Sequence, residues 1–209
     1  MSQQGTVHRY VTLEQVEELR DASYEREQRY DSSLRDEVMV VLLADLGLRA
    51  VELTKLKKSM FNLSDETVTI PASIQKDYPV EGISPSTARL ELDKYGHFST
   101  ARLLRQYFNS DWWTNKETEY LFPSRQSEKV STQTVQNTIK ELAETAGVSP
   151  HRTDGEASDP SELHPHALRH SLASYMLQDP ETRLVDVRNR LRHRSISTTE
   201  RIYEHFQTR

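Results

Sequence analysis

The chain has 209 residues, of which 35% are hydrophobic, and its formal net charge is −5. This length allows one compact domain with a modest core, and no apolar run approaches the roughly 18 residues that a membrane-spanning helix needs. Because the chain contains no cysteine, disulfides and thiolate metal sites are excluded. No signal-peptide pattern opens the chain, so we expect a cytoplasmic protein with no membrane partner.

Charge is unevenly distributed along the chain. Acidic residues concentrate in the first part, at Glu14, Glu17, Glu18, Asp21, Glu25, Glu27, Asp36 and Glu37. Arginines concentrate near the end, at Arg183, Arg188, Arg190, Arg192, Arg194 and Arg201. Because arginine pairs with phosphate through parallel hydrogen bonds, this end predicts an anionic partner despite the negative net charge. The acidic, lysine-poor composition also predicts a halophilic protein, since excess carboxylates keep a protein hydrated in a high-salt cytoplasm.

The first half of the chain predicts helices and a small sheet. Leu13, Val16 and Leu19 recur at helical spacing after Thr12, which can cap the helix. In chain order, the expected elements are this first helix, a periodic helix from Leu34 that stops at Gly47, a short helix at Ala50–Leu56, paired strands at Met60–Leu63 and Thr67–Ile70, an irregular segment at Pro71–Pro85 and a third strand at Arg89–Leu92.

The second half predicts mostly helices. Their expected ranges are about Ser99–Asn109, Thr132–Ala146, His166–Leu177, Glu181–Leu191 and Ser197–Phe206. A run of Pro, Asp, Gly and Ser predicts a loop at Ser149–Pro160. The fold class expected for the whole chain is therefore mainly α with a small antiparallel β-sheet, an α+β fold.

Two polar clusters stand at predicted helix starts. Arg49 follows a Gly-Leu turn, where free N–H groups favour anions; the alternative is a surface arginine paired with Glu52. Later, His166, Arg169 and His170 share one helix face at i, i+3 and i+4. That second cluster is open to three interpretations: an anion site, a solvated polar face, or a zinc pair made by the two histidines.

Two further clusters lie near the end of the chain. A basic loop runs from Leu191 through Arg192 and His193 to a series of helix-capping residues. Tyr203 lies on the helix predicted after it, where a tyrosine is ordinarily an amphipathic anchor.

Taken together and in order, the four clusters resemble the tyrosine recombinase, or phage integrase, family. In that family an arginine follows a Gly-Leu turn, and then come a His-x-x-Arg-His box, a Leu-Gly-His box and a tyrosine before the C-terminus. Gly47-Leu48-Arg49, His166 to His170, Leu191-Arg192-His193 and Tyr203 occupy those places. The resemblance covers about residues 10–207, so we expect residues 1–209 to form a single catalytic domain, without the family's N-terminal core-binding domain.

The resemblance implies DNA strand cleavage and rejoining in site-specific recombination or integration. Arg49 and Arg169 would neutralise the charge that builds on the phosphate in the transition state, and His166 and His193 would add hydrogen bonds. Tyr203 would attack to give a 3′-phosphotyrosine and a free 5′-hydroxyl. The partners implied are double-stranded DNA and further protomers in a tetrameric synapse on DNA, with no cofactor and no metal.

A proton donor for the leaving oxygen is also implied, which in the family is a lysine of the small sheet. Lys76, just after the strand predicted to end at Ile70, is the candidate, and Lys94 is the alternative. Glu52 is expected to orient Arg49 as a supporting residue. His170 is expected to support the second box.

The sequence departs from the family pattern in two details of these motifs. Arg192 replaces the usual glycine of the third box, and Tyr203 lies ten residues after His193 where the family usually has nine. These departures keep open the alternative of a catalytically impaired DNA-binding relative. A type IB topoisomerase-like nicking and closing enzyme, which shares the chemistry, is a further alternative.

Overall fold

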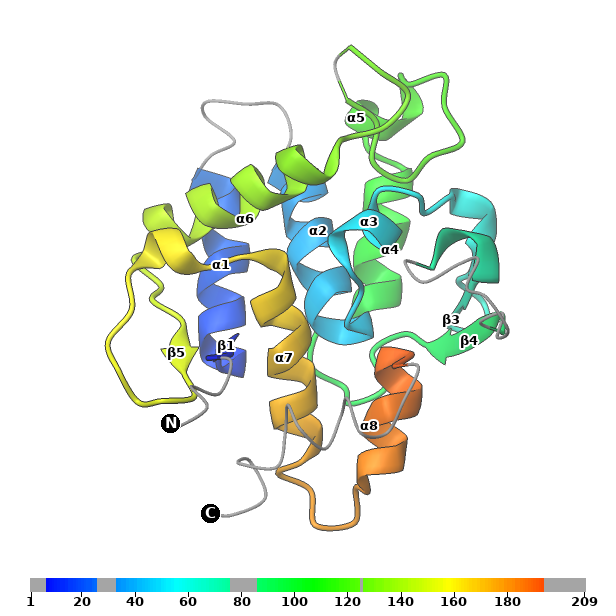
Figure 1. Cartoon of the computed structure of the whole chain (residues 1–209). Coiled ribbons are helices and arrows are strands. Elements are labelled where there is room, and N and C mark those ends of the chain that lie inside the picture. The colour runs from blue at the N-terminus through cyan, green and yellow to red at the C-terminus, as the bar shows by residue number, and fades with distance from the viewer. Residues whose placement is uncertain (1–6, 26–32, 76–85, 125, 194–209) are drawn as a thin grey trace.

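The computed structural model describes residues 7–25, 33–75, 86–124 and 126–193. Helix α2 (Ser33–Leu46) lies at its centre (Figure 1). Residues Val38 to Leu43 have no exposed surface, which explains why this helix is apolar on every side. The longer helices packed against α2 are α1 (Leu13–Glu25), α4 (Thr100–Phe108), α6 (Thr132–Ala146) and α7 (Pro165–Met176).

Shorter elements precede, join or follow these helices along the described chain. They are the helices α3 (Ala50–Leu53), α5 (Asp111–Thr114) and α8 (Leu184–Leu191) and 3-10 turns at Lys58–Met60, Ala72–Ile74 and Pro160–Glu162. Both ends of helix α6 follow directly from capping chemistry. Ser131 accepts a hydrogen bond from the N–H of Thr134 at the start of α6, and Gly147 ends it with a φ of +68°.

Two small antiparallel sheets are present among the described residues. Strands β2 (Phe61–Asn62), β3 (Thr67–Ile70) and β4 (Ala88–Glu91) pair in that order. Strands β1 (Arg9–Tyr10) and β5 (His151–Arg152) form the second sheet at the other side of the molecule (Figure 1). The expectation of one sheet and of a plain loop at 149–160 was therefore wrong, because a two-residue strand leaves no alternation to detect.

The mainly helical α+β fold class is confirmed, with local differences. Helix α6 has the predicted bounds, whereas α3 is one turn long and does not reach Leu56. Helix α8 begins at Leu184 instead of Glu181, because the Asp186 carboxylate accepts the N–H of Arg183 at 3.0 Å and caps the helix there. The helix predicted at Ser197–Phe206 lies outside the described residues.

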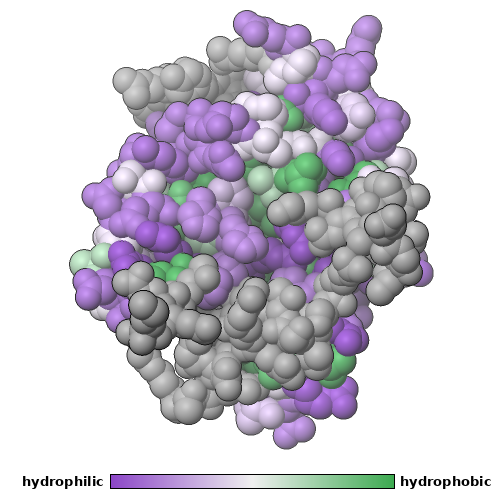
Figure 2. Space-filling model, in the orientation of Figure 1, coloured by the Kyte–Doolittle hydropathy of each residue, from purple (hydrophilic) through white to green (hydrophobic). Residues whose placement is uncertain are grey.

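The described surface is strongly hydrophilic on the face drawn in Figure 2, where purple residues predominate and apolar residues appear in small patches. Along α1, Glu14, Glu18, Asp21 and Glu25 are exposed while Val16 and Leu19 are buried. Among the described residues no helix has both the length and the apolar character needed to cross a bilayer.

Candidate active site

The turn at Gly47 brings the end of α2 against α7 and α8. Gly47 has a φ of +55°, and a Cβ atom there would lie 2.4 Å from Leu191 Cδ2 and 3.1 Å from Leu172 Cδ2. The position requires glycine both for its backbone conformation and for this close approach. As a result, Arg49 is delivered to the junction where the three helices meet.

Arg49 begins α3 and is paired with Glu52. Its Nη1 donates to Glu52 Oε1 at 3.1 Å, and its backbone N–H donates to Glu52 Oε2 at 2.9 Å. Glu52 is fully buried, whereas 17% of the Arg49 side chain is exposed. Burial acts to raise the pKa of Glu52, but the charges of Arg192, Arg169 and Arg49 outweigh it and hold the pKa below its usual value. The carboxylate therefore stays ionised beside Arg49.

Helix α7 carries the second group of residues. His164 caps the helix by accepting the N–H of Ala167 at 3.3 Å, and Pro165 occupies the first turn. Arg169 is fully buried, and its guanidinium donates to the carbonyl oxygens of Gly47 and Leu191. This one side chain thus ties α7 to the ends of both α2 and α8.

The end of α8 supplies the third group. Its backbone closes with hydrogen bonds from the N–H of Arg192 to Asn189 O (3.1 Å) and from the N–H of His193 to Arg188 O (3.0 Å), the pattern of a Schellman motif. Arg192 has a φ of +57° in this motif. The left-handed turn that a glycine would provide is therefore kept, and it carries His193 to the site.

The histidines of the site have low pKa values. Desolvation, followed by the positive charges of Arg169 and other nearby groups, lowers the pKa of His166 to about 4. Desolvation, Arg169 and Arg49 lower the pKa of His193 to about 3. Both rings are thus neutral near pH 7, able to donate one hydrogen bond and to accept a proton. Two guanidiniums with neutral imidazoles form a site suited to an oxyanion.

The structure brings together six of the residues singled out from sequence. Electrostatic effects on pKa values link five of them, which are Arg49, Glu52, His166, Arg169 and His193. The ring of the sixth, His170, lies edge-on to that of His166 with centroids 4.4 Å apart. Lys76 and Tyr203 lie outside the described residues. Lys94 follows β4 and lines a separate groove with Asp186 and Arg190.

Sequence reasoning did not assign a site role to three residues that the fold brings to this region. The ring of His8 lies 4.7 Å from that of His170, because β1 packs against α7. His164 lies beside His166, with centroids 6.4 Å apart. Arg192 was singled out only as a departure from a motif. No periodicity or spacing links His8 to α7, so only tertiary packing reveals it.

The histidines do not form a metal site with the other described residues. Within the described ranges, no three His, Asp or Glu side chains are placed to hold one metal ion. The zinc interpretation of His166 and His170 therefore has no third ligand in that part of the chain.

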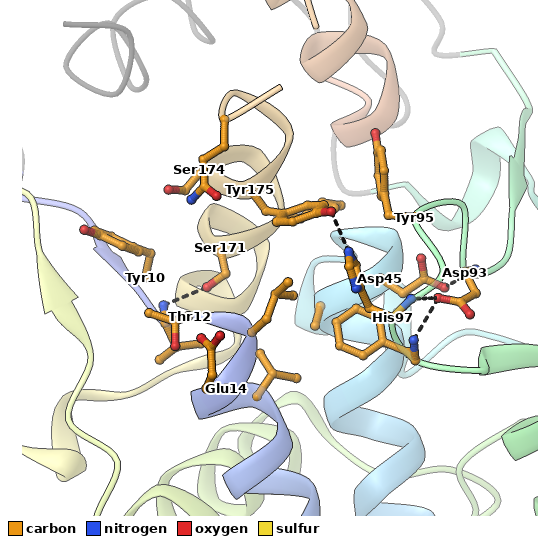
Figure 3. Close-up of a pocket in the computed structure, with 17 residues that line it drawn as sticks. Tyr10, Thr12, Glu14, Asp45, Asp93, Tyr95, His97, Ser171, Ser174 and Tyr175 are labelled. Atoms are coloured by element: carbon orange, nitrogen blue, oxygen red, sulfur yellow. Dashed lines mark hydrogen bonds between the residues drawn. The ribbon is translucent and has the colours of Figure 1, made fainter. Parts of the chain in front are cut away.

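A separate cavity of about 220 Å³ lies between the start of α1, α7 and residues 93–98 (Figure 3). Its lining includes Tyr95, Tyr175 and the carboxylates of Asp45 and Asp93, but none of its described lining residues is Lys or Arg. Figure 3 shows His97 hydrogen-bonded to the Tyr175 hydroxyl across it. An acidic and aromatic lining does not suit a phosphate, so this cavity is distinct from the candidate active site.

Comparison with known proteins gives matches over most of the chain. The family model described as "Phage integrase family" matches residues 9–209. Tyrosine recombinase XerC of Histophilus somni is 28% identical over 195 residues, covering 93% of this chain and 56% of that protein. Tyrosine recombinase XerD of Haemophilus ducreyi is 32% identical over 174 residues, covering 82% and 50%. The chain thus spans about half the length of these relatives.

Solved structures share the fold. The XerA recombinase has a TM-score of 0.68 at 22% identity, with 92% of this chain and 59% of that chain covered. The XerH site-specific recombinase bound to its difH substrate has a TM-score of 0.65 at 18% identity, covering 92% and 50%.

Proposed function

The chain belongs to the phage integrase family, and from this premise we propose that it cleaves and rejoins DNA strands in site-specific recombination, with Tyr203 as nucleophile. The observation that carries the proposal is the convergence of Arg49, Arg169, His166 and His193. They come from three separate segments and meet where their charges act on one another. Such a site fits the non-bridging oxygens of a phosphodiester.

The proposed reaction uses each of these groups. Arg49 and Arg169 neutralise the charge that builds on the phosphate as the Tyr203 oxygen attacks phosphorus. The tyrosine proton passes to His166, whose ring is neutral near pH 7 and therefore has a nitrogen lone pair free to take it up. His193 donates a hydrogen bond to the same phosphate. The bond to the 5′-oxygen breaks, and a 3′-phosphotyrosine remains, which conserves the phosphodiester energy for rejoining without ATP.

Lys76 is the proposed donor of the proton that the leaving 5′-oxygen takes up. It lies in the segment that joins β3 to β4. Lys94 is less suitable, because it lies beyond β4 in the groove that it shares with Asp186.

The proposed partners are double-stranded DNA and further protomers of this chain, assembled as a tetramer on DNA. The XerH structures similar to this chain are described as complexes with a difH substrate. Of the two departures that favour a binding-only protein, the replacement of glycine by Arg192 is weakened as an argument, because Arg192 keeps the left-handed turn. The ten-residue spacing between His193 and Tyr203 is the other departure.

The experiment is a search for covalent complexes on suicide duplexes. A pool of duplexes with a randomised central sequence carries a nick, so that the fragment released by cleavage diffuses away and rejoining cannot occur. Covalent protein–DNA complexes are isolated after denaturation and their DNA is sequenced. We expect the wild type to form complexes on a recurring sequence and the Tyr203→Phe variant to form none.

Tyr24→Phe is the matched control. Tyr24 donates to Glu37 near the start of α2, at the opposite end of that helix from the site, so this variant should react as the wild type does. Absence of any covalent complex would favour a binding-only protein. A complex that survives Tyr203→Phe would assign the nucleophile to another residue. Strand exchange between two duplexes, as opposed to relaxation of supercoils, separates recombinase from topoisomerase activity.

A further inference from the structure

Three arginine side chains gather on the C-terminal end of α2. Arg190 donates to the Asp45 carbonyl at 2.9 Å, Arg192 donates to the Leu46 carbonyl at 3.2 Å, and Arg169 donates to that of Gly47. The last carbonyls of a helix have no partner within the helix and carry its partial negative charge. These guanidiniums satisfy them from α7 and α8.

Arg192 differs from the other two because its backbone carries a cost. A side chain at a φ of +57° is disfavoured because its Cβ crowds the following carbonyl oxygen, and glycine is the usual residue at this place in a Schellman motif. The side chain is nevertheless almost completely buried, with 4% of it exposed. Interactions of this side chain must therefore offset both the strained backbone and the loss of its hydration.

The strongest of these interactions joins Arg192 to Glu52. Arg192 Nη2 donates to Glu52 Oε2 at 3.0 Å, while Arg49 Nη1 donates to Glu52 Oε1 at 3.1 Å. One buried carboxylate thus bridges two guanidiniums, one from α3 and one from the residue next to His193. Arg192 Nη2 also donates to Gly47 O at 3.3 Å, a carbonyl that Arg169 shares. The phosphate-binding candidates are connected through this bridge.

The charges explain what the bridge does. With Arg49 alone, the full negative charge of Glu52 would oppose the positive charge that Arg49 presents to a phosphate. With Arg192 sharing the carboxylate, the three groups carry a net positive charge, and Glu52 has a second ionic partner on its other oxygen. Arg192 also holds the end of α8, and hence His193, against α3.

Resting on the function proposed above, we propose that Arg192 is a positioning residue: its guanidinium, through the shared carboxylate of Glu52, orients Arg49 and holds His193 for phosphate binding. Arg192 does not itself touch the reacting atoms in this assignment. Its presence makes this chain's third box a charged link where the family has a glycine turn.

The test compares three variants of Arg192 with a matched control. Arg192→Met keeps the bulk of the side chain and the backbone cost but removes the charge. Arg192→Gly removes the side chain, its charge and the backbone cost. Arg192→Lys keeps the charge. Arg188→Met removes a positive charge from the same helix, where the side chain hydrogen-bonds to the adjacent Asn189. The rate of covalent complex formation is measured in single turnover, and the Kd for duplex is measured in the Tyr203→Phe background.

We expect Arg192→Met and Arg192→Gly to slow cleavage by about 10- to 100-fold, as a misplaced catalytic group does, with Kd changed much less. Arg192→Lys should recover part of the rate, and Arg188→Met should keep it. The rate of Arg192→Met should also fall more steeply than that of the wild type from pH 7 to pH 5. Without Arg192, the burial of Glu52 is less opposed, so its pKa rises and it takes up a proton.

A double-mutant cycle with Glu52→Gln tests the route of the effect. If Arg192 acts through Glu52, Arg192→Met will cost little more in the Glu52→Gln background. The proposal would be overturned if the rate losses of Arg192→Met and Glu52→Gln multiplied in the double variant. A wild-type rate in Arg192→Met, or a loss seen only in the Kd for duplex, would overturn it as well.

A spectroscopic readout separates this inference from the proposed function. The Nε–Hε resonance of Arg49, assigned with Arg49→Lys, should shift in Arg192→Met and stay in place in Arg188→Met, with no DNA present. An unmoved resonance would overturn the positioning role even in an active enzyme. A shifted resonance in a protein that cleaves no sequence would mean that the proposed function, and not the link through Glu52, is wrong.

Discussion

At the scale of single residues, burial distinguishes two arginines that have the same proposed role. Arg169 is fully buried and donates to two backbone carbonyls, whereas Arg49 is partly exposed and pairs with Glu52 in its own helical turn. Both guanidiniums are proposed to bind the phosphate. Arg169 also holds three helices together, so its replacement should affect stability as well as activity.

Arg49→Lys and Arg169→Lys should both slow covalent complex formation by about 10²–10³-fold, because lysine offers a point charge in place of a planar fork of donors. Arg169→Lys should in addition lower the free energy of unfolding by about 1–3 kcal/mol, since the Leu191 carbonyl loses its guanidinium donor and Gly47 O keeps only that of Arg192. Cleavage assays and urea unfolding of both variants measure the two effects. Equal stability losses would contradict the distinction drawn from burial.

The proposed role of Lys76 has its own test in the leaving group. Lys76→Ala should slow cleavage of an ordinary duplex by about 10²–10⁴-fold, the usual contribution of a general acid. On a duplex with sulfur at the bridging 5′ position, whose thiolate leaves without a proton, the variant should approach the wild-type rate. Lys94→Ala is the matched control and should be normal on both substrates; the reverse pattern would assign the role to Lys94.

Histidine burial also makes stability depend on pH. Burial, followed by the neighbouring His166, lowers the pKa of His170 well below its usual 6.5. His170 therefore binds a proton in the unfolded chain but stays neutral in the folded protein, and the free energy of unfolding decreases as the pH falls below about 6.5. His170 alone should cost about 2 kcal/mol between pH 7 and pH 5. Urea unfolding should show a smaller loss over this window in His170→Gln; an equal loss would contradict it.

At the scale of elements, the ends of helices position the site. Gly47 directly follows the end of α2, Arg49 is the N-cap residue of α3, and Arg192 is the C-cap residue of α8. The start of α3 places Arg49 and the end of α8 places His193, and each of the three ends is in contact with a neighbouring element. The closest of these contacts is between Gly47 and Leu191.

Gly47→Ala is expected to destabilise the protein more than Gly147→Ala does. Both glycines have a left-handed φ, which costs about 1 kcal/mol for alanine. A Cβ at Gly147 meets nothing within 4 Å, whereas at Gly47 it meets Leu191 at 2.4 Å. Overpacking should add about 1–3 kcal/mol at Gly47, as measured by urea unfolding. Equal losses would show that α8 yields freely to the added methyl group.

At the scale of the whole molecule, local charge and net charge have opposite signs. The protein is acidic overall, with 32 acidic and 27 basic residues, yet the candidate site gathers Arg49, Arg169 and Arg192 around one carboxylate. Part of the acidic excess lies on the exposed face of α1. In contrast, Asp36 and Glu37 are buried and paired with Arg35 and Arg20.

The halophilic hypothesis predicts a salt response of the whole protein. The thermal unfolding midpoint should rise between about 0.1 M and molar KCl, because salt screens repulsion among exposed carboxylates. Neutralising the outer face of α1 with Glu18→Gln, Asp21→Asn and Glu25→Gln together should reduce that rise. Cleavage that is fastest near physiological salt, with no gain in stability at molar salt, would contradict the hypothesis.

Local sequence determined much of this protein by itself. Apolar spacing and capping residues located α1, α2 and α6, and four ordered motifs identified the family and six residues that meet at the site. This succeeded because helix periodicity, glycine turns and capping depend on neighbours within a few residues.

Tertiary structure decided what depends on contacts between distant segments. Strands β1 and β5, the approach of His8 to His170 and the burial of Arg192 on Glu52 have no local signature. From sequence, Arg192 was a departure from a glycine turn; in the fold, its side chain is an ion-paired link between α8 and α3. Long-range packing decides whether such a residue is strained, exposed or paired, and its nearest neighbours in sequence cannot.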